Sequence, residues 1–314
     1  MARKVGFSVF LFPDSVGQMS FANKLLSIST RPSDTFAAKN EVEINKMSER
    51  YDLIDIGINL AHRSFQEDRE AVIQRALDAG VTTMIITGTN QVRSQEAQRI
   101  ASGHPTHLFA TVGVHPHYSR DCNADTIPEL KRLAALSQVV AIGECGLDFN
   151  RDFSPRPQQE KWFEAQVALA EELQKPLFLH ERDASQRFTE ILLAVRKSVP
   201  AVVHCFTGSR EALKTYLDMG LHIGITGWIC DERRGQSLRQ LVREIPLDRL
   251  MVETDAPFLV PRSMPTRPKD GRNEPCYLPF VLEAVADCLG KPCVEVANTT
   301  TATARDFFRI KKPS

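Results

Sequence analysis

A regular alternation of two kinds of segment constrains the fold most; it begins at Asp52 and continues almost to the end of the chain. Short apolar runs rich in β-branched residues are separated by longer stretches with apolar residues at helical spacing. This alternation predicts βαβ units and a parallel sheet whose strands are buried on both faces. The eight predicted strands are Leu53–Ile58, Thr83–Thr87, Leu108–Val114, Val139–Gly143, Leu177–Leu179, Ala201–Phe206, Ile223–Thr226 and Leu250–Val252.

The number of units predicts a closed barrel. Eight βα units in roughly 250 residues match the size of a (β/α)8 barrel. We therefore predict an α/β fold with a single TIM-barrel domain over residues 50–314. The alternative, an open doubly wound sheet, usually carries a Gly-rich phosphate loop after its first strand, and none stands there. The pattern from Pro292 to Phe308 predicts an extra helix beyond the eighth unit.

Local signals mark helix ends. Ser64 and Glu67 have the spacing of a capping box, in which each side chain satisfies a free backbone N–H, so we predict a helix that starts there. Gly80 and Gly220 follow amphipathic stretches, where glycine most easily adopts a positive φ. These two glycines predict the ends of two helices.

The first 49 residues lie outside the repeating pattern. Residues 17–46 are polar, rich in Ser, Thr and Asn, and aperiodic, which predicts a poorly structured, disordered extension. An alternative is that Met47 is the true start, since the strand pattern begins five residues after it. A secretory signal is disfavoured, because the apolar part of MARKVGFSVFLF is short and no small-residue cleavage site follows.

Composition excludes several classes of protein. Lys+Arg and Asp+Glu are equal at 39 each, whereas a protein that simply coats nucleic acid shows a basic excess. The chain has no apolar run near 20 residues, so we expect no membrane span. Its seven cysteines lack CxxC spacing and argue against a disulfide framework. We therefore expect a cytoplasmic protein whose cysteines are reduced.

Polar side chains stand where the predicted strands end. The carboxyl ends of barrel strands form one rim, which carries the active site of such barrels. Five strands end there in His or a carboxylate, and buried carboxylates are costly unless they are paired or bind metal. Two imidazoles and two carboxylates aimed at the barrel axis predict a metal site. The predicted ligands are Glu144, His180, His204 and Asp255.

Several sequence blocks carry a resemblance to a known family. They are Gly-Glu144-Cys-Gly-Leu-Asp148, His180 with Arg182-Asp183-Ala184, His204-Cys-Phe-Thr-Gly208, Glu253-Thr-Asp255-Ala-Pro257 and Arg272-Asn-Glu-Pro275. In order and spacing they resemble the signature blocks of the TatD-type metal-dependent deoxyribonucleases, barrels of the amidohydrolase type, over residues 52–310. The resemblance is strongest to the bacterial TatD branch. It implies a 3′–5′ exonuclease of single-stranded DNA, with RNA as a further substrate, and a role in DNA repair or turnover.

The first strand departs from the pattern of many TatD relatives. They open with Asp-Ser-His-x-His, whose two histidines hold one metal of a pair, whereas this chain has Asp55-Ile-Gly57-Ile-Asn59. A second metal position would retain only Glu144 as a bridge and Asp255, assisted by Asn59 or Asp55. Such an oxygen-rich position suits Mg²⁺, which keeps several waters and shares phosphate oxygens. We expect one resident ion, Mg²⁺ ahead of Mn²⁺ or Zn²⁺, and a second that enters with the substrate.

The remaining candidate residues receive roles in phosphodiester hydrolysis. Asp255 is the candidate base that orients and deprotonates water, while Glu144 holds the metal. Arginine pairs bidentately with phosphate. The predicted phosphate ligands are His115, His117, Arg182, Arg233 and Arg272. Simpler readings stay open: a loop cap for His117, a surface ion pair for Arg182, and a solvated charge cluster for Arg233.

Three functional hypotheses follow. The first is a Mg²⁺-dependent nuclease that acts, as a monomer without a membrane partner, on single-stranded DNA or RNA. The second is a metal hydrolase of another ester, such as an aminoacyl-tRNA deacylase, because one fold hosts many reactions. The third is a binding protein without catalysis, which the retained metal-ligand set disfavours, since buried charges without a partner cost stability.

Overall fold

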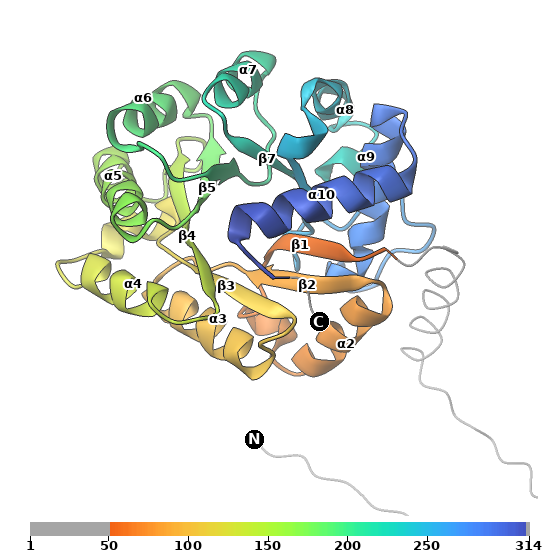
Figure 1. The fold of residues 1–314 in the computed structure, drawn as a ribbon, viewed down its shortest axis with the longest axis horizontal. Coiled ribbons are helices and arrows are strands. Elements are labelled where there is room, and N and C mark those ends of the chain that lie inside the picture. The colour runs from red at the N-terminus through yellow and green to blue at the C-terminus, as the bar shows by residue number, and fades with distance from the viewer. Residues whose placement is uncertain (1–50, 312–314) are drawn as a thin grey trace, which may run out of the picture.

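The computed structural model describes residues 51–311 and contains a (β/α)8 barrel (Figure 1), as predicted. Eight parallel strands pair in sequence order from the first to the eighth. The strands are β1 (Leu53–Ile58), β2 (Val81–Ile86), β3 (Leu108–Val112), β4 (Val139–Asp148), β5 (Leu177–Arg182), β6 (Ala201–Val203), β7 (His222–Ile225) and β8 (Leu250–Val252). The predicted extension, residues 1–49, and the alternative start at Met47 lie outside the described residues.

Helices surround the strands on the outside of the barrel (Figure 1). The α-helices are α2 (Arg69–Asp78), α3 (Gln91–Gly103), α4 (Thr126–Ala134), α5 (Arg156–Leu173), α6 (Ser185–Val195), α7 (Arg210–Asp218), α8 (Gln236–Leu241), α9 (Leu278–Leu289) and α10 (Cys293–Phe308). Short 3-10 helices lie in the connections: η1 (Arg63–Phe65), η2 (Pro116–Asp121), η3 (Gly227–Cys230), η4 (Val242–Glu244), η5 (Leu247–Arg249) and η6 (Pro275–Tyr277). Within residues 51–311, none of these helices has the length and apolar character to cross a membrane.

The predicted start of the first helix is wrong. Ser64 lies in η1, where the ring of His62 accepts a hydrogen bond from its backbone N–H, and α2 begins only at Arg69. The residues with capping-box spacing therefore belong to a short 3-10 turn and do not start an α-helix. The predicted stops are confirmed: Gly80 has a φ of +83° just after α2, and Gly220 has a φ of +74° just after α7.

Strands β4 and β5 extend further than the apolar pattern predicted. Their pairing continues past Gly143 and Leu179 to the register Asp148↔Arg182. Glu144 and His180 thus lie within strands rather than in the loops behind them. The extended pairing fixes the backbone that carries both side chains, which is a precondition for a rigid site.

A buried carboxylate joins the two ends of the sheet. Asp55 on β1 is fully buried, and its Oδ1 accepts hydrogen bonds from the backbone N–H of Thr254 at 3.0 Å and of Gly57 at 3.2 Å. Its Oδ2 accepts from the Thr254 hydroxyl. Beyond the strand ends, Asn59 N–H donates to Ala256 O at 2.7 Å. Asp55 therefore braces the seam between β1 and β8, which explains a polar residue in an otherwise apolar strand.

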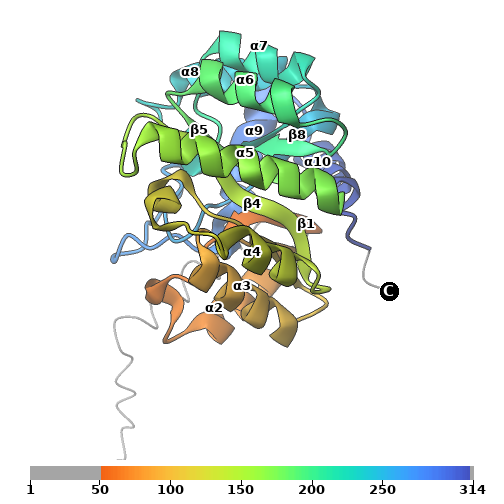
Figure 2. The same ribbon diagram turned by 90° about the vertical axis from the view of Figure 1, so that its left-hand side faces the viewer.

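The interior of the barrel forms an apolar cluster of its own, which α10 closes at one end. Phe307 and Phe308 of α10 pack against interior residues that include Ile54, Phe178 and Met251. Figure 2 shows α10 at one end of the barrel, and loops that follow the strands project at the other end. The predicted extra helix is thus a plug at the amino-terminal end of the strands, and the opposite rim remains for a site.

Candidate metal centre

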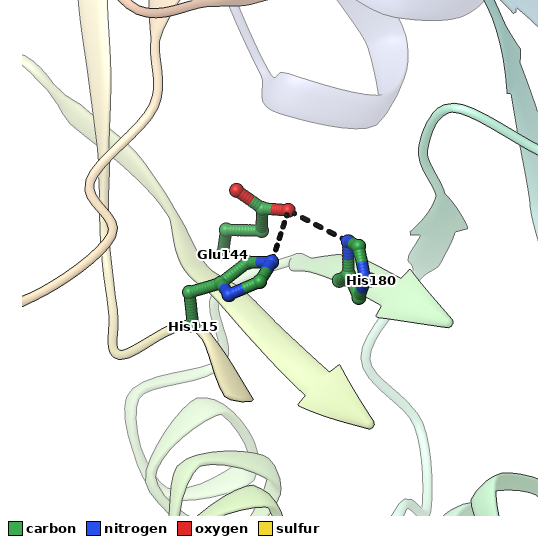
Figure 3. A group of neighbouring side chains, drawn as sticks. All are labelled: His115, Glu144 and His180. Carbon is green, nitrogen blue, oxygen red and sulfur yellow. Dashed lines mark hydrogen bonds and ion pairs between the residues drawn. The ribbon is translucent and has the colours of Figure 1, made fainter. Parts of the chain in front are cut away.

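Four neighbouring strands deliver the side chains of the centre. Glu144 lies on β4 and His180 on β5, while His115 follows β3 and His204 follows β6. Figure 3 shows His115 and His180 pointing at the carboxylate of Glu144. The strands therefore bring together, at one rim, residues that are up to 89 positions apart in the chain.

One carboxylate oxygen is surrounded by three imidazoles. Glu144 Oε1 lies 2.7 Å from His204 Nε2, 3.0 Å from His180 Nδ1 and 3.4 Å from His115 Nε2. Burial alone would raise the pKa of Glu144, but the histidines, led by His204, outweigh it and hold this pKa well below its ordinary value. Glu144 is therefore a carboxylate at neutral pH and can act as a ligand.

The donor set fits a divalent cation. Glu144 Oε1 and one ring nitrogen each of His115 and His180 lie within 4.8 Å of one another, and His204 contacts the same oxygen. Imidazole and carboxylate together are the usual ligands of divalent metals in hydrolases. The structure thus brings together three predicted ligands and adds His115, which the sequence had assigned to phosphate.

Two further carboxylates lie behind the imidazoles. Asp148 Oδ2 lies 3.4 Å from His180 Nε2 and 2.7 Å from His117 Nε2. Glu253 Oε2 lies 3.4 Å from His204 Nδ1 and is fully buried. A carboxylate behind a histidine fixes the orientation and tautomer of its ring. Nothing in the sequence indicated this role for Glu253 except its position two residues before Asp255.

Asp255 completes the rim from the end of β8. Its Oδ1 accepts a hydrogen bond from Asn59 Nδ2 at 3.0 Å. Burial raises the pKa of Asp255 to about 7; the charge of His204 opposes this shift, and Glu144 and Glu253 add to it. Of the two predicted accessory residues, Asn59 therefore joins the site, whereas the carboxylate of Asp55 is committed to the barrel seam.

The space at position 57 is already filled. A Cβ on Gly57 would lie 2.3 Å from Glu253 Oε2 and 3.0 Å from Phe178 Cζ. Real Cβ atoms essentially never approach other atoms this closely. This strand therefore has no room for the first histidine of the two-histidine pattern, so long as Glu253 keeps its position.

The centre opens into a cavity of about 560 Å³, the catalytic cavity, which has a basic wall. Of the predicted phosphate ligands, His115, His117 and Arg182 line it, together with Arg93 of α3 and Arg151 of the loop after β4. The sequence missed Arg93 and Arg151, because neither stands at a strand end.

The structure does not bring the other two predicted phosphate ligands to this cavity. Arg272 donates to both oxygens of Asp68 and to Glu274, at distances of 2.6–2.8 Å, so its guanidinium is occupied by acidic partners. Arg233 lies outside the lining, although its neighbour Arg234 lines a second cavity next to it. Both arginines stand in motif-like blocks, yet neither lines the catalytic cavity.

Comparisons with known proteins agree with this geometry. The family model described as TatD related DNase matches residues 54–309. A protein of Pantoea sp. (strain At-9b) named 3′-5′ ssDNA/RNA exonuclease TatD is 53% identical over 259 residues, which is 82% of this chain and 100% of that protein. A protein of the same name from Erwinia billingiae is 51% identical, over 82% of this chain and 99% of that protein.

Solved structures give the same result. The crystal structure of a TatD homologue from Escherichia coli K12 superposes with a TM-score of 0.75 at 25% identity, covering 84% of this chain and 100% of that one. A TatD family hydrolase from Entamoeba histolytica superposes with a TM-score of 0.74 at 25% identity, over 82% of this chain and 98% of that one.

Proposed function

Since this chain belongs to the TatD-related DNase family, and so hydrolyses phosphodiester bonds, we propose that it is a 3′–5′ exonuclease of single-stranded DNA and RNA. The observation that carries the proposal is the convergence of three imidazoles on Glu144 Oε1 beside a cavity with three arginines in its wall. The substrate and the polarity are supported by relatives named for them at 51–53% identity. We also propose a role in DNA repair or turnover, processes that require removal of single-stranded ends.

We propose Mg²⁺ as the physiological ion. Glu144, His115, His180 and His204 would hold it, and Asp255 lies beside them. Such an ion supplies a Lewis acid that polarises the phosphoryl oxygen. The choice of Mg²⁺ depends on the carboxylates of Glu144 and Asp255, since oxygen ligands suit Mg²⁺ and Mn²⁺, whereas imidazole ligands suit Zn²⁺. Titration of metal-free protein with each of the three ions decides between them. The highest activity with Zn²⁺ alone would overturn the choice of Mg²⁺.

In the proposed reaction, Asp255 takes a proton from the attacking water. The amide of Asn59 holds its Oδ1, which leaves Oδ2 free to accept that proton. The oxygen of the water then bonds to phosphorus, and the bond from phosphorus to the leaving oxygen breaks. The leaving oxygen takes a proton from solvent water and departs as a hydroxyl group. Arg93, Arg151 and Arg182 line the cavity and bind the charge of the phosphodiester. A base with a pKa near 7 is well matched to this step at neutral pH.

The experiment uses single-stranded DNA labelled at either end, digested with Mg²⁺ by the wild type and by Asp255→Asn. We expect stepwise shortening from the 3′ end, and a loss of about 10²–10⁴-fold in kcat for Asp255→Asn. Asp218→Asn is the matched control, since it makes the same chemical change at an exposed position in α7. Equal cleavage by Asp255→Asn and the wild type would refute the role of Asp255.

Two further properties complete the proposal. We propose that a monomer is active, because every side chain of the described centre comes from one chain; one peak at the monomer mass in active fractions tests this. We also propose a cytoplasmic location, supported by the thiols of Cys145, Cys205 and Cys230, which form no disulfide within residues 51–311. Fractionation of cells that express the tagged protein tests the location.

A further inference from the structure

A second cavity adjoins the catalytic cavity. Its volume is about 330 Å³, and its lining includes Trp228, Asp231, Arg234, Leu259, Arg262 and Arg267; we call it the arginine cavity. Trp228 and Leu259 line both cavities, so the two share a wall. The reaction proposed above uses none of the three arginines.

The arginine cavity carries surplus positive charge. Its single lining acid, Asp231, pairs with Arg262 Nε at 3.0 Å. The other oxygen of Asp231 accepts the backbone N–H groups of Arg233 at 3.0 Å and Arg234 at 3.2 Å, so both oxygens are engaged. Within residues 51–311, the exposed side chains of Arg234 and Arg267 have no acidic partner at ion-pair distance. Two guanidinium groups are therefore available for an anion.

An aromatic ring lies at the junction of the two cavities. The guanidinium of Arg234 lies 6.0 Å from the centroid of the Trp228 ring, and this ring is only partly buried. Grooves that bind single-stranded nucleic acid combine cationic side chains along the backbone with aromatic faces on which bases stack. The shared wall thus has the two kinds of group that such a strand requires.

We propose that the arginine cavity binds backbone phosphates of the nucleotides on the 5′ side of the scissile bond, while Trp228 stacks on a base between the two cavities. This inference rests on the proposed 3′–5′ exonuclease function. With the 3′-terminal nucleotide in the catalytic cavity, the rest of the strand leaves toward its 5′ end. Arg234 and Arg267 then contact phosphates that a very short substrate lacks.

The test compares the double variant Arg234→Ala/Arg267→Ala with the wild type on a dT₂ dinucleotide, whose one phosphate is the scissile one, and on a dT₁₂ dodecanucleotide. We expect KM for the dodecanucleotide to rise about tenfold at unchanged kcat, and KM for the dinucleotide to stay within about twofold. The slope of log KM against log salt on the dodecanucleotide should fall by about 1.4, because each single-strand phosphate contact contributes about 0.7.

Two further variants separate this site from general effects. Arg99→Ala/Arg132→Ala removes the same charge from two exposed, ion-paired arginines on α3 and α4, and should leave both KM values unchanged. Arg234→Lys/Arg267→Lys keeps the charge and should stay within about threefold of the wild type.

The results of this test separate failure of the arginine cavity as a binding site from failure of the proposed nuclease function. A wild type that cleaves neither oligonucleotide refutes the nuclease proposal itself. A wild type that cleaves both, with an unchanged dodecanucleotide KM in the alanine variant, refutes only the arginine cavity as a binding site. An equal rise of KM on both lengths also refutes it, because the arginines would then act on the terminal nucleotide.

Discussion

Gly57 offers a sharp test of why the first strand lacks its histidine. Substitution by alanine adds one methyl group, whose carbon would lie 2.3 Å from Glu253 Oε2. Both residues are fully enclosed in the barrel, and Phe178 approaches the same point at 3.0 Å. The methyl group can be accommodated only if the buried carboxylate moves.

The cost of that movement can be estimated from the contacts of Glu253. Its Oε1 accepts the backbone N–H of Cys205 at 2.5 Å, and its Oε2 lies 3.4 Å from His204 Nδ1. Overpacking a core by one methyl group costs about 1–3 kcal/mol. Loss of a hydrogen bond to a charged group costs about 1.5–3 kcal/mol more. We therefore expect Gly57→Ala to lower the free energy of unfolding by about 2.5–6 kcal/mol.

The assay is urea denaturation, in which the midpoint should fall while the slope m stays constant. Gly103→Ala is the matched control, because a Cβ at Gly103 meets nothing within 4 Å. That substitution should leave stability unchanged or raise it by up to about 1 kcal/mol. If Gly57→Ala unfolds within about 0.5 kcal/mol of the wild type, the space at position 57 is not closed, and the steric account of the missing histidine is wrong.

Three other predictions concern buried groups. Glu253→Gln should weaken metal binding about 10–100-fold, measured by titration of metal-free protein, because His204 loses the carboxylate behind its ring. Phe307→Ala should cost about 3–5 kcal/mol in urea denaturation, whereas Val294→Ala, an exposed position of the same helix, should cost under about 0.5 kcal/mol. Burial, aided by Arg249, lowers the pKa of His222 to about 4, so stability should fall as the pH drops from about 6.5 toward 4, where only the unfolded chain gains this proton. His222→Gln should make this pH dependence shallower by about 1–2 kcal/mol across that range, and equal curves for both proteins would contradict the assignment.

The sequence was sufficient to predict the barrel because this fold consists of repeated βα units. Each parallel strand is buried on both faces, so it appears as an unbroken apolar run, and eight such runs leave few topologies. The ends of β4 and β5 were missed because Glu144 and His180 interrupt the apolar pattern while the backbone ladder continues. The start of α2 was missed because a capping box and a 3-10 turn use the same residues.

Prediction of the metal centre from the sequence was limited because the sequence does not give the direction of each side chain. Strand ends indicated Glu144, His180, His204 and Asp255, since the fold alone brings strand ends together. Whether His115 contacts a metal ligand or a phosphate depends on its rotamer. The sequence alone does not predict that rotamer.

Whether the guanidinium of an arginine is available for phosphate likewise depends on acidic residues that are distant in the sequence. Arg272 pairs with Asp68, 204 positions away, while Arg234 and Arg267 meet no such acid within residues 51–311.

We infer that the change at the first strand affects the chemistry of Asp255 and does not only remove metal ligands. Asn59 stands where relatives with the two-histidine pattern carry a metal ligand, yet its amide donates a hydrogen bond to Asp255 Oδ1. Burial, with the charges of Glu144 and Glu253, raises the pKa of Asp255 to about 7, and the hydrogen bond from Asn59 opposes this shift. Each cation bound nearby would lower that pKa, so a second resident ion would make Asp255 a poorer base than a single ion does. Loss of the two histidines is therefore consistent with an active enzyme in which Asp255 serves chiefly as the proton acceptor.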